Sequence, residues 1–105
     1  MKLILFRGGK PGTAAVLPGD DPCVELSDLL GGQVELSPLG HGMLLATLAE
    51  GEALRLPLRY TAHRLGRAPV PIAGDCAVVA INGGGTLTDV TAAQMEQARS
   101  FVRCM

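Results

Sequence analysis

Aromatic residues are scarce in this chain of 105 amino acids, which has no tryptophan, one tyrosine and two phenylalanines. Proteins that bind single-stranded nucleic acid stack the bases on aromatic side chains, so this composition argues against that class. Aliphatic residues supply most of the 48% hydrophobic content, and only 18% of the residues are charged. These values predict a folded globular protein with a closely packed aliphatic core.

Cysteine is also rare, and its placement excludes two further classes. Cys23, Cys76 and Cys104 are odd in number and form no CxxC pair. The sequence therefore predicts neither a disulfide framework nor a zinc knuckle. We expect a protein of the reducing cytoplasm that uses no metal and no cofactor.

Long hydrophobic runs are missing as well. The longest are "LILF" and "AVVAI", which are far too short to span a bilayer. The first residues reach Arg7 before a signal-peptide core has formed. We expect no contact with a membrane, and the length of the chain predicts one domain over residues 1–105.

The net charge of −1 argues against binding of a long DNA duplex, which usually requires a clearly basic protein. Residues 55–67 nevertheless carry four arginines and no acid. Such a segment suits an acidic partner or a phosphate, although a solvated edge strand and loop is the simpler explanation. The candidate binding residues are Arg55, Arg59, His63, Arg64 and Arg67, together with His41 in the turn Gly40–Gly42.

The hydrophobic pattern predicts an α+β fold, in which a mixed, mainly antiparallel sheet carries one short helical turn and a C-terminal helix. We expect strands at residues 2–6, 14–17, 33–39, 43–50, 54–60 and 76–81, and a long loop at 63–75. Residues 23–32 fit either a short strand followed by a single helical turn or one short helix, and helical structure is favoured at 27–30. Asp21 and Pro22 are suited to start such a helix, and Gly31 to end it. The final helix is expected to begin after Thr91, or after the competing Thr88, and to continue to the end of the chain.

Alternation within residues 33–39 predicts which side chains of that strand are buried. Val34 and Leu36 share one face, which we expect to point into the core, while Glu35 and Ser37 share the other. Pro57 lacks an N–H, so the strand at 54–60 is expected at a sheet edge or in a bulge.

Four groups of residues are candidates for catalytic or ligand sites, and none of them predicts an enzyme. His63 could activate Cys76 beside Asp75, but Cys76 opens a strand that is expected to be buried. The loop "NGGGT" lacks the lysine and glycine order of phosphate-binding loops, and Glu50 with Glu52 is typical of a solvated turn. His41 has no partners at metal-ligand spacing.

Several segments in order resemble one family of small proteins. These are "LLGGQVELSPLGHGMLLATLAEGE", "LPLR", "IAGDCAVVA" and "LTDVTAAQMEQARSFV", which span about residues 24–102. The family comprises uncharacterised proteins encoded largely on phages, plasmids and conjugative elements of Firmicutes. Members commonly carry asparagine after the leucine-proline step, where this chain has Leu58 and Arg59. The resemblance implies a fold and a genetic context but no activity.

Together these features predict a non-enzymatic accessory protein of a mobile genetic element that contacts an unknown protein through its arginines. The alternative is a nucleic-acid-associated regulator that uses the same segment. A third and less favoured hypothesis is a thiol- or histidine-dependent enzyme. We also expect a homodimer, because a small sheet tends to cover a free edge with a symmetric copy.

Overall fold

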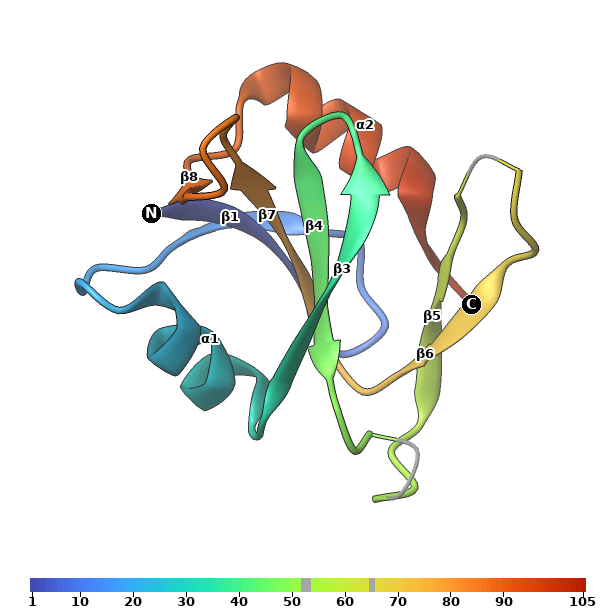
Figure 1. Cartoon of the computed structure of the whole chain (residues 1–105). Coiled ribbons are helices and arrows are strands. Elements are labelled where there is room, and N and C mark those ends of the chain that lie inside the picture. Colours follow the sequence, from blue (N-terminus) through green and yellow to red (C-terminus); the bar gives the residue numbers. More distant parts are fainter. Residues whose placement is uncertain (52–53, 65) are drawn as a thin grey trace.

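The computed structural model describes residues 1–51, 54–64 and 66–105, which form two antiparallel sheets and two helices (Figure 1). The predicted α+β class is confirmed. The sheets are not mixed, because every strand pair among the described residues is antiparallel. The elements are β1 (Lys2–Phe6), β2 (Thr13–Val16), α1 (Pro22–Leu30), β3 (Val34–Gly40), β4 (Met43–Leu48), β5 (Leu58–Ala62), β6 (Val70–Ala73), β7 (Cys76–Ile81), β8 (Leu87–Thr88), α2 (Ala92–Phe101) and β9 (Val102–Cys104).

The larger sheet has the order β2-β1-β7-β4-β3, and β8 adds to one end of β7. Strand β7 lies in the middle and is buried on both faces. Val78 packs in the core on the α2 side of the sheet, and Val79 packs in the core on the α1 side. This double burial explains the uninterrupted run "CAVVAI", because neither face of the strand meets water.

Local signals at both ends determine α1. The Asp21 carboxylate accepts a hydrogen bond from the Val24 N–H, and Pro22 occupies the first turn. Gly31 ends the helix with a φ of 90°, a left-handed conformation that favours glycine. The expected N-cap at Asp21 and the expected end at Gly31 are confirmed. The helix covers Pro22–Leu30 and is therefore longer than the single turn favoured at 27–30. Leu26 and Leu30 pack its apolar side onto the sheet.

Helix α2 begins as predicted but ends earlier. Thr91 and Gln94 form a reciprocal capping box, whereas the competing Thr88 belongs to β8. The chain after Phe101 is not helical, because Val102 leaves the helix and pairs with Ala62 as part of β9. Val102 is fully buried there, so long-range packing outweighs the helical pattern of the preceding residues.

The smaller sheet has the order β6-β5-β9, and two predictions fail in it. The segment expected as a loop contains β6, whose residues pair with β5. The strand expected at 54–60 begins only at Leu58, because the chain turns at Leu54–Arg55. Arg55 has a φ of 56°, which no regular strand accommodates.

Neither α1 nor α2 has the length and apolar character needed to cross a membrane.

Candidate functional site: a cleft between the two sheets

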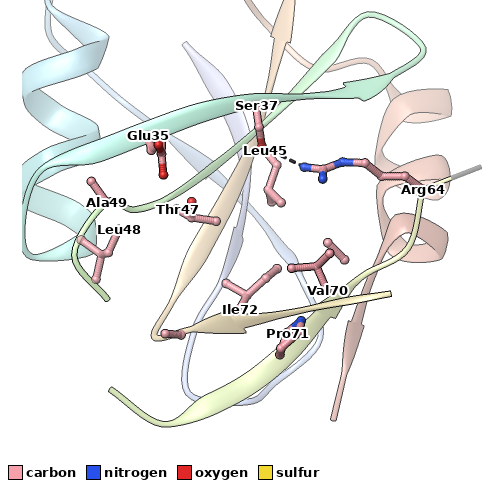
Figure 2. Close-up of a pocket in the computed structure, with 12 residues that line it drawn as sticks. Glu35, Ser37, Leu45, Thr47, Leu48, Ala49, Arg64, Val70, Pro71 and Ile72 are labelled. Atoms are coloured by element: carbon pink, nitrogen blue, oxygen red, sulfur yellow. Dashed lines mark hydrogen bonds between the residues drawn. The ribbon is translucent and has the colours of Figure 1, made fainter. Parts of the chain in front are cut away.

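The polar face of β3 is turned toward the smaller sheet, where Ser37 is half-buried and Glu35 stays exposed (Figure 2). Glu35 and Ser37 project from β3 on the same side as Leu45 and Thr47 of β4. The opposite face of β3 was expected in the core, but α1 covers only part of it. Val34 is half-buried there, and Leu36 is 39% exposed, so the predicted burial of Leu36 is wrong.

Strands β5 and β6 form the second wall, and between the walls lies a cleft of about 370 Å³, which we call the inter-sheet cleft. This volume lies within the range of ordinary ligand sites. Its lining combines apolar side chains with four polar or charged ones, Glu35, Ser37, Thr47 and Arg64. The lining residues are Glu35, Ser37, Leu45, Thr47, Leu48, Ala49, Ala62, Arg64, Val70, Pro71, Ile72 and Ala73.

Arg64 brings a positive charge to this cleft. It follows β5, and its Nη2 donates a hydrogen bond of 2.8 Å to Ser37 Oγ across the gap between the sheets (Figure 2). Its Nε is buried and has no hydrogen-bond partner among the described residues. A buried donor without a partner loses the free energy of hydration without compensation, so this arrangement of Arg64 carries a cost in stability.

The charge of Arg64 is not neutralised by an ion pair within the described residues. The ion pairs found in the described part of the chain are Arg7–Asp75 at 3.9 Å and Arg99–Glu96 at 3.5 Å, and neither involves Arg64. A guanidinium group binds carboxylates and phosphates with two parallel hydrogen bonds. The cleft therefore suits a ligand with an anionic group and an apolar body, which Leu45 and Ile72 can contact.

The other predicted binding residues do not join Arg64 in one surface. Arg55 lies in the turn before β5 and is exposed. Arg59 lines a second, shallower hollow with Arg7 and Asp75, and its side chain lies near Gly9. Arg67 is exposed in the turn that follows Arg64. The arginine-rich segment is thus not one patch, because it passes through a turn, a strand and a second turn.

Both histidines contact residues of α2, and these contacts join separate elements of the fold. His41 stacks on Phe101 with a ring-centroid distance of 5.6 Å, and its carbonyl accepts a hydrogen bond from Gln94 Nε2. These contacts attach the β3–β4 turn to α2. The backbone N–H of His63 donates to the Phe101 carbonyl, which aligns the ends of β5 and α2.

His63, Asp75 and Cys76 do not form a thiol site. His63 follows β5 in the smaller sheet, whereas Cys76 opens β7, the central strand of the larger sheet, which pairs with β1 and β4. The Asp75 carboxylate instead accepts a hydrogen bond from the Gly8 N–H. Cys76 is fully buried, and burial together with the nearby Asp75 charge raises the pKa of its thiol to about 12. A thiol with this pKa carries almost no thiolate at neutral pH and is a poor nucleophile.

Thiol labelling can check this contrast directly. Cys23 and Cys104 are exposed, so a chromogenic disulfide reagent should titrate two thiols of the native protein within minutes. Cys76 should react only after unfolding, at least about 100-fold more slowly under native conditions. Cys76→Ala provides the control, since it should remove the slow phase alone. A fast third thiol in the native protein would contradict the burial of Cys76.

The remaining candidates have structural roles or lie outside the described residues. In the loop after β7, the Asn82 side chain accepts hydrogen bonds from the backbone N–H groups of Gly84 and Thr86, so the loop organises itself. The proposed pairing of Glu50 with Glu52 lies partly outside the described residues, because Glu52 is not among them. Within residues 1–51, 54–64 and 66–105, no group of histidine, cysteine and acidic side chains is arranged to hold a metal.

Comparison of the chain with protein-family models, with curated proteins and with solved structures found no match. Arguments about function therefore depend on the inter-sheet cleft. Sequence reasoning included Arg64 in the candidate site but missed Ser37 and Thr47. For Ser37 the only signal was alternation, which placed it on the polar face of its strand without showing that a second sheet lies opposite. Thr47 lies in the run "MLLATLAE", which was expected to be apolar on both faces, so it gave no such signal.

Proposed function

We propose that this protein is a non-enzymatic interaction module that binds an acidic, partly apolar segment of a partner protein in the inter-sheet cleft. The observation that carries the proposal is the Arg64 guanidinium, which lines the cleft beside apolar side chains and forms no ion pair among the described residues. A carboxylate side chain would pair with the Arg64 guanidinium, and neighbouring apolar side chains of the segment would contact Leu45, Val70 and Ile72.

The shape of the site favours an extended segment over a compact one. Strands β3 and β6 are edge strands of their sheets, and both border the cleft. An extended chain placed along a strand edge gains backbone hydrogen bonds, and alternate side chains enter the pocket beside it. The resemblance to proteins of mobile elements suggests a role as an accessory protein of such an element, and an interaction module suits that context.

We expect Arg64→Gln to weaken binding of a cleft ligand by about 10- to 100-fold, because a charge-assisted hydrogen bond is lost. Suitable ligands can be selected from a display library of random peptides and measured by titration calorimetry. The matched control is Arg67→Gln, which removes the same charge three residues away on an exposed turn and should leave the affinity unchanged. Circular dichroism should show that both variants are folded.

Three results would contradict this proposal. The selected peptides could lack acidic residues, Arg64→Gln could bind as tightly as the wild type, or binding could perturb NMR signals away from Ser37, Thr47 and Ile72. The alternative is a nucleic-acid-associated regulator that uses Arg55–Arg67. It would be supported by salt-sensitive retention of nucleic acid that is lost in the double variant Arg55→Glu/Arg59→Glu while peptide binding persists.

A further inference from the structure

Strand β2 is an outer edge of the larger sheet and differs from the other edges. Edge strand β3 carries Glu35 and Pro38, β6 carries Pro71, and β9 carries Arg103. Charged residues and proline protect strand edges from pairing with other chains. Strand β2 has the sequence TAAV, which contains neither, and Val16 is 68% exposed. Within the described part of the chain, β2 and the two-residue strand β8 are the edges without such protection, and β2 is the longer of the two.

The hydrogen bonds of β1 show which groups of β2 are free to pair. Met1 and Leu17 exchange two bonds, of 2.7 and 2.8 Å, so they form a hydrogen-bonded pair just beyond the strand ends. Bonded pairs alternate along an antiparallel ladder, so Ala15 bonds to Leu3 and Thr13 bonds to Leu5. The N–H and C=O groups of the intervening residues, Ala14 and Val16, therefore point away from β1.

We propose that β2 pairs with β2 of a second copy of this chain, antiparallel about a twofold axis through Ala15. In this register Ala14 lies opposite Val16 of the partner subunit, and the symmetry repeats the pair. All outward N–H and C=O groups of Ala14 and Val16 in both copies then find partners. The exposed Val16 side chain packs beside Ala14 of the partner subunit on the same face of the joined sheet.

The charges that flank β2 fit the same register. Lys10 precedes the strand and Asp20 follows it, and both are exposed. An antiparallel pair centred on Ala15 brings the loop that holds Lys10 to the same end of the interface as the loop that holds Asp20 of the partner subunit. A parallel pair would instead bring like charges together, so the charges favour the twofold arrangement.

This dimer leaves the inter-sheet cleft open, because β2 and β3 are the opposite edges of the larger sheet (Figure 1). The two clefts of a dimer would lie at its outer ends and could bind two segments of one partner at once. The inference does not depend on what the cleft binds.

Sedimentation equilibrium of the full chain tests the dimer. The interface is small, so we expect a dissociation constant of about 10⁻⁴ M, with monomer at low micromolar concentration. Ala14→Pro removes an outward N–H without removing a bond to β1, and it should shift the protein to monomer while circular dichroism stays unchanged. A protein that is still entirely monomeric at about 1 mM would overturn the proposal.

Charge reversal and hydrogen exchange test the register even if Ala14→Pro fails to fold. Lys10→Glu and Asp20→Lys should each weaken the dimer by about threefold or more at low salt, and the double variant should restore it. The Ala14 and Val16 amides should gain protection from exchange as protein concentration rises, whereas Thr13 and Ala15 should be protected throughout. A dimer whose concentration-dependent protection lies elsewhere, or whose double variant is not restored, would overturn this interface.

Discussion

Replacing Tyr60 with alanine is expected to lower the free energy of unfolding by about 3–5 kcal/mol, the largest effect of any single change considered for this protein. Tyr60 has no exposed surface and is the largest fully buried side chain. Its ring meets Phe6 edge to face at 5.6 Å, and so connects β5 of the smaller sheet with β1 of the larger one. Its hydroxyl donates a hydrogen bond of 2.8 Å to the Lys10 carbonyl.

Tyr60→Phe separates the ring from the hydroxyl. It keeps the packing and removes one hydrogen bond, so we expect a loss of about 1 kcal/mol. Urea unfolding followed by circular dichroism measures both variants. If Tyr60→Ala lowered the free energy of unfolding by less than about 1 kcal/mol, the contact between Tyr60 and Phe6 would not be what holds the smaller sheet against the larger one.

Alkaline pH should destabilise the protein through Cys76. Burial raises the pKa of this thiol from 9.0 to about 12, so above pH 9 the unfolded chain releases a proton that the folded protein retains. The free energy of unfolding is therefore unaffected by this group below about pH 9 and falls as the pH rises toward 12, by up to about 1.4 kcal/mol per pH unit. Burial also raises the pKa of Tyr60, which acts in the same direction at higher pH.

Urea unfolding between pH 8 and pH 10.5, in the presence of a reductant, measures this dependence. Cys76→Ala should flatten the curve above pH 9, although it also shifts the whole curve by the cost of the removed sulfur. Cys104→Ala is the matched control, because Cys104 is exposed and its removal should leave the slope unchanged. A slope that is equal in both variants would show that other groups cause the alkaline loss.

Sequence alone was sufficient for the elements whose determinants are local. The Asp21–Pro22 start of α1, the Gly31 stop and the Thr91–Gln94 capping box each involve residues a few positions apart. The α+β class and the buried strand β7 followed from the hydrophobic pattern, which reports burial directly. These features need no knowledge of the distant chain, because their hydrogen bonds and burial preferences lie within one short segment.

Tertiary structure decided the rest, and the reason is long-range pairing. Strands β6 and β9 exist because β5 lies between them and supplies hydrogen bonds to both, so neither is evident from its own residues. Arg64 faces the cleft because Ser37, 27 positions earlier, accepts its hydrogen bond. The sequence by itself determined which residues are polar, apolar or charged. Only the packing of one sheet against the other decided that Glu35, Ser37 and Arg64 would line a common cleft, while Arg55, Arg59 and Arg67 are dispersed.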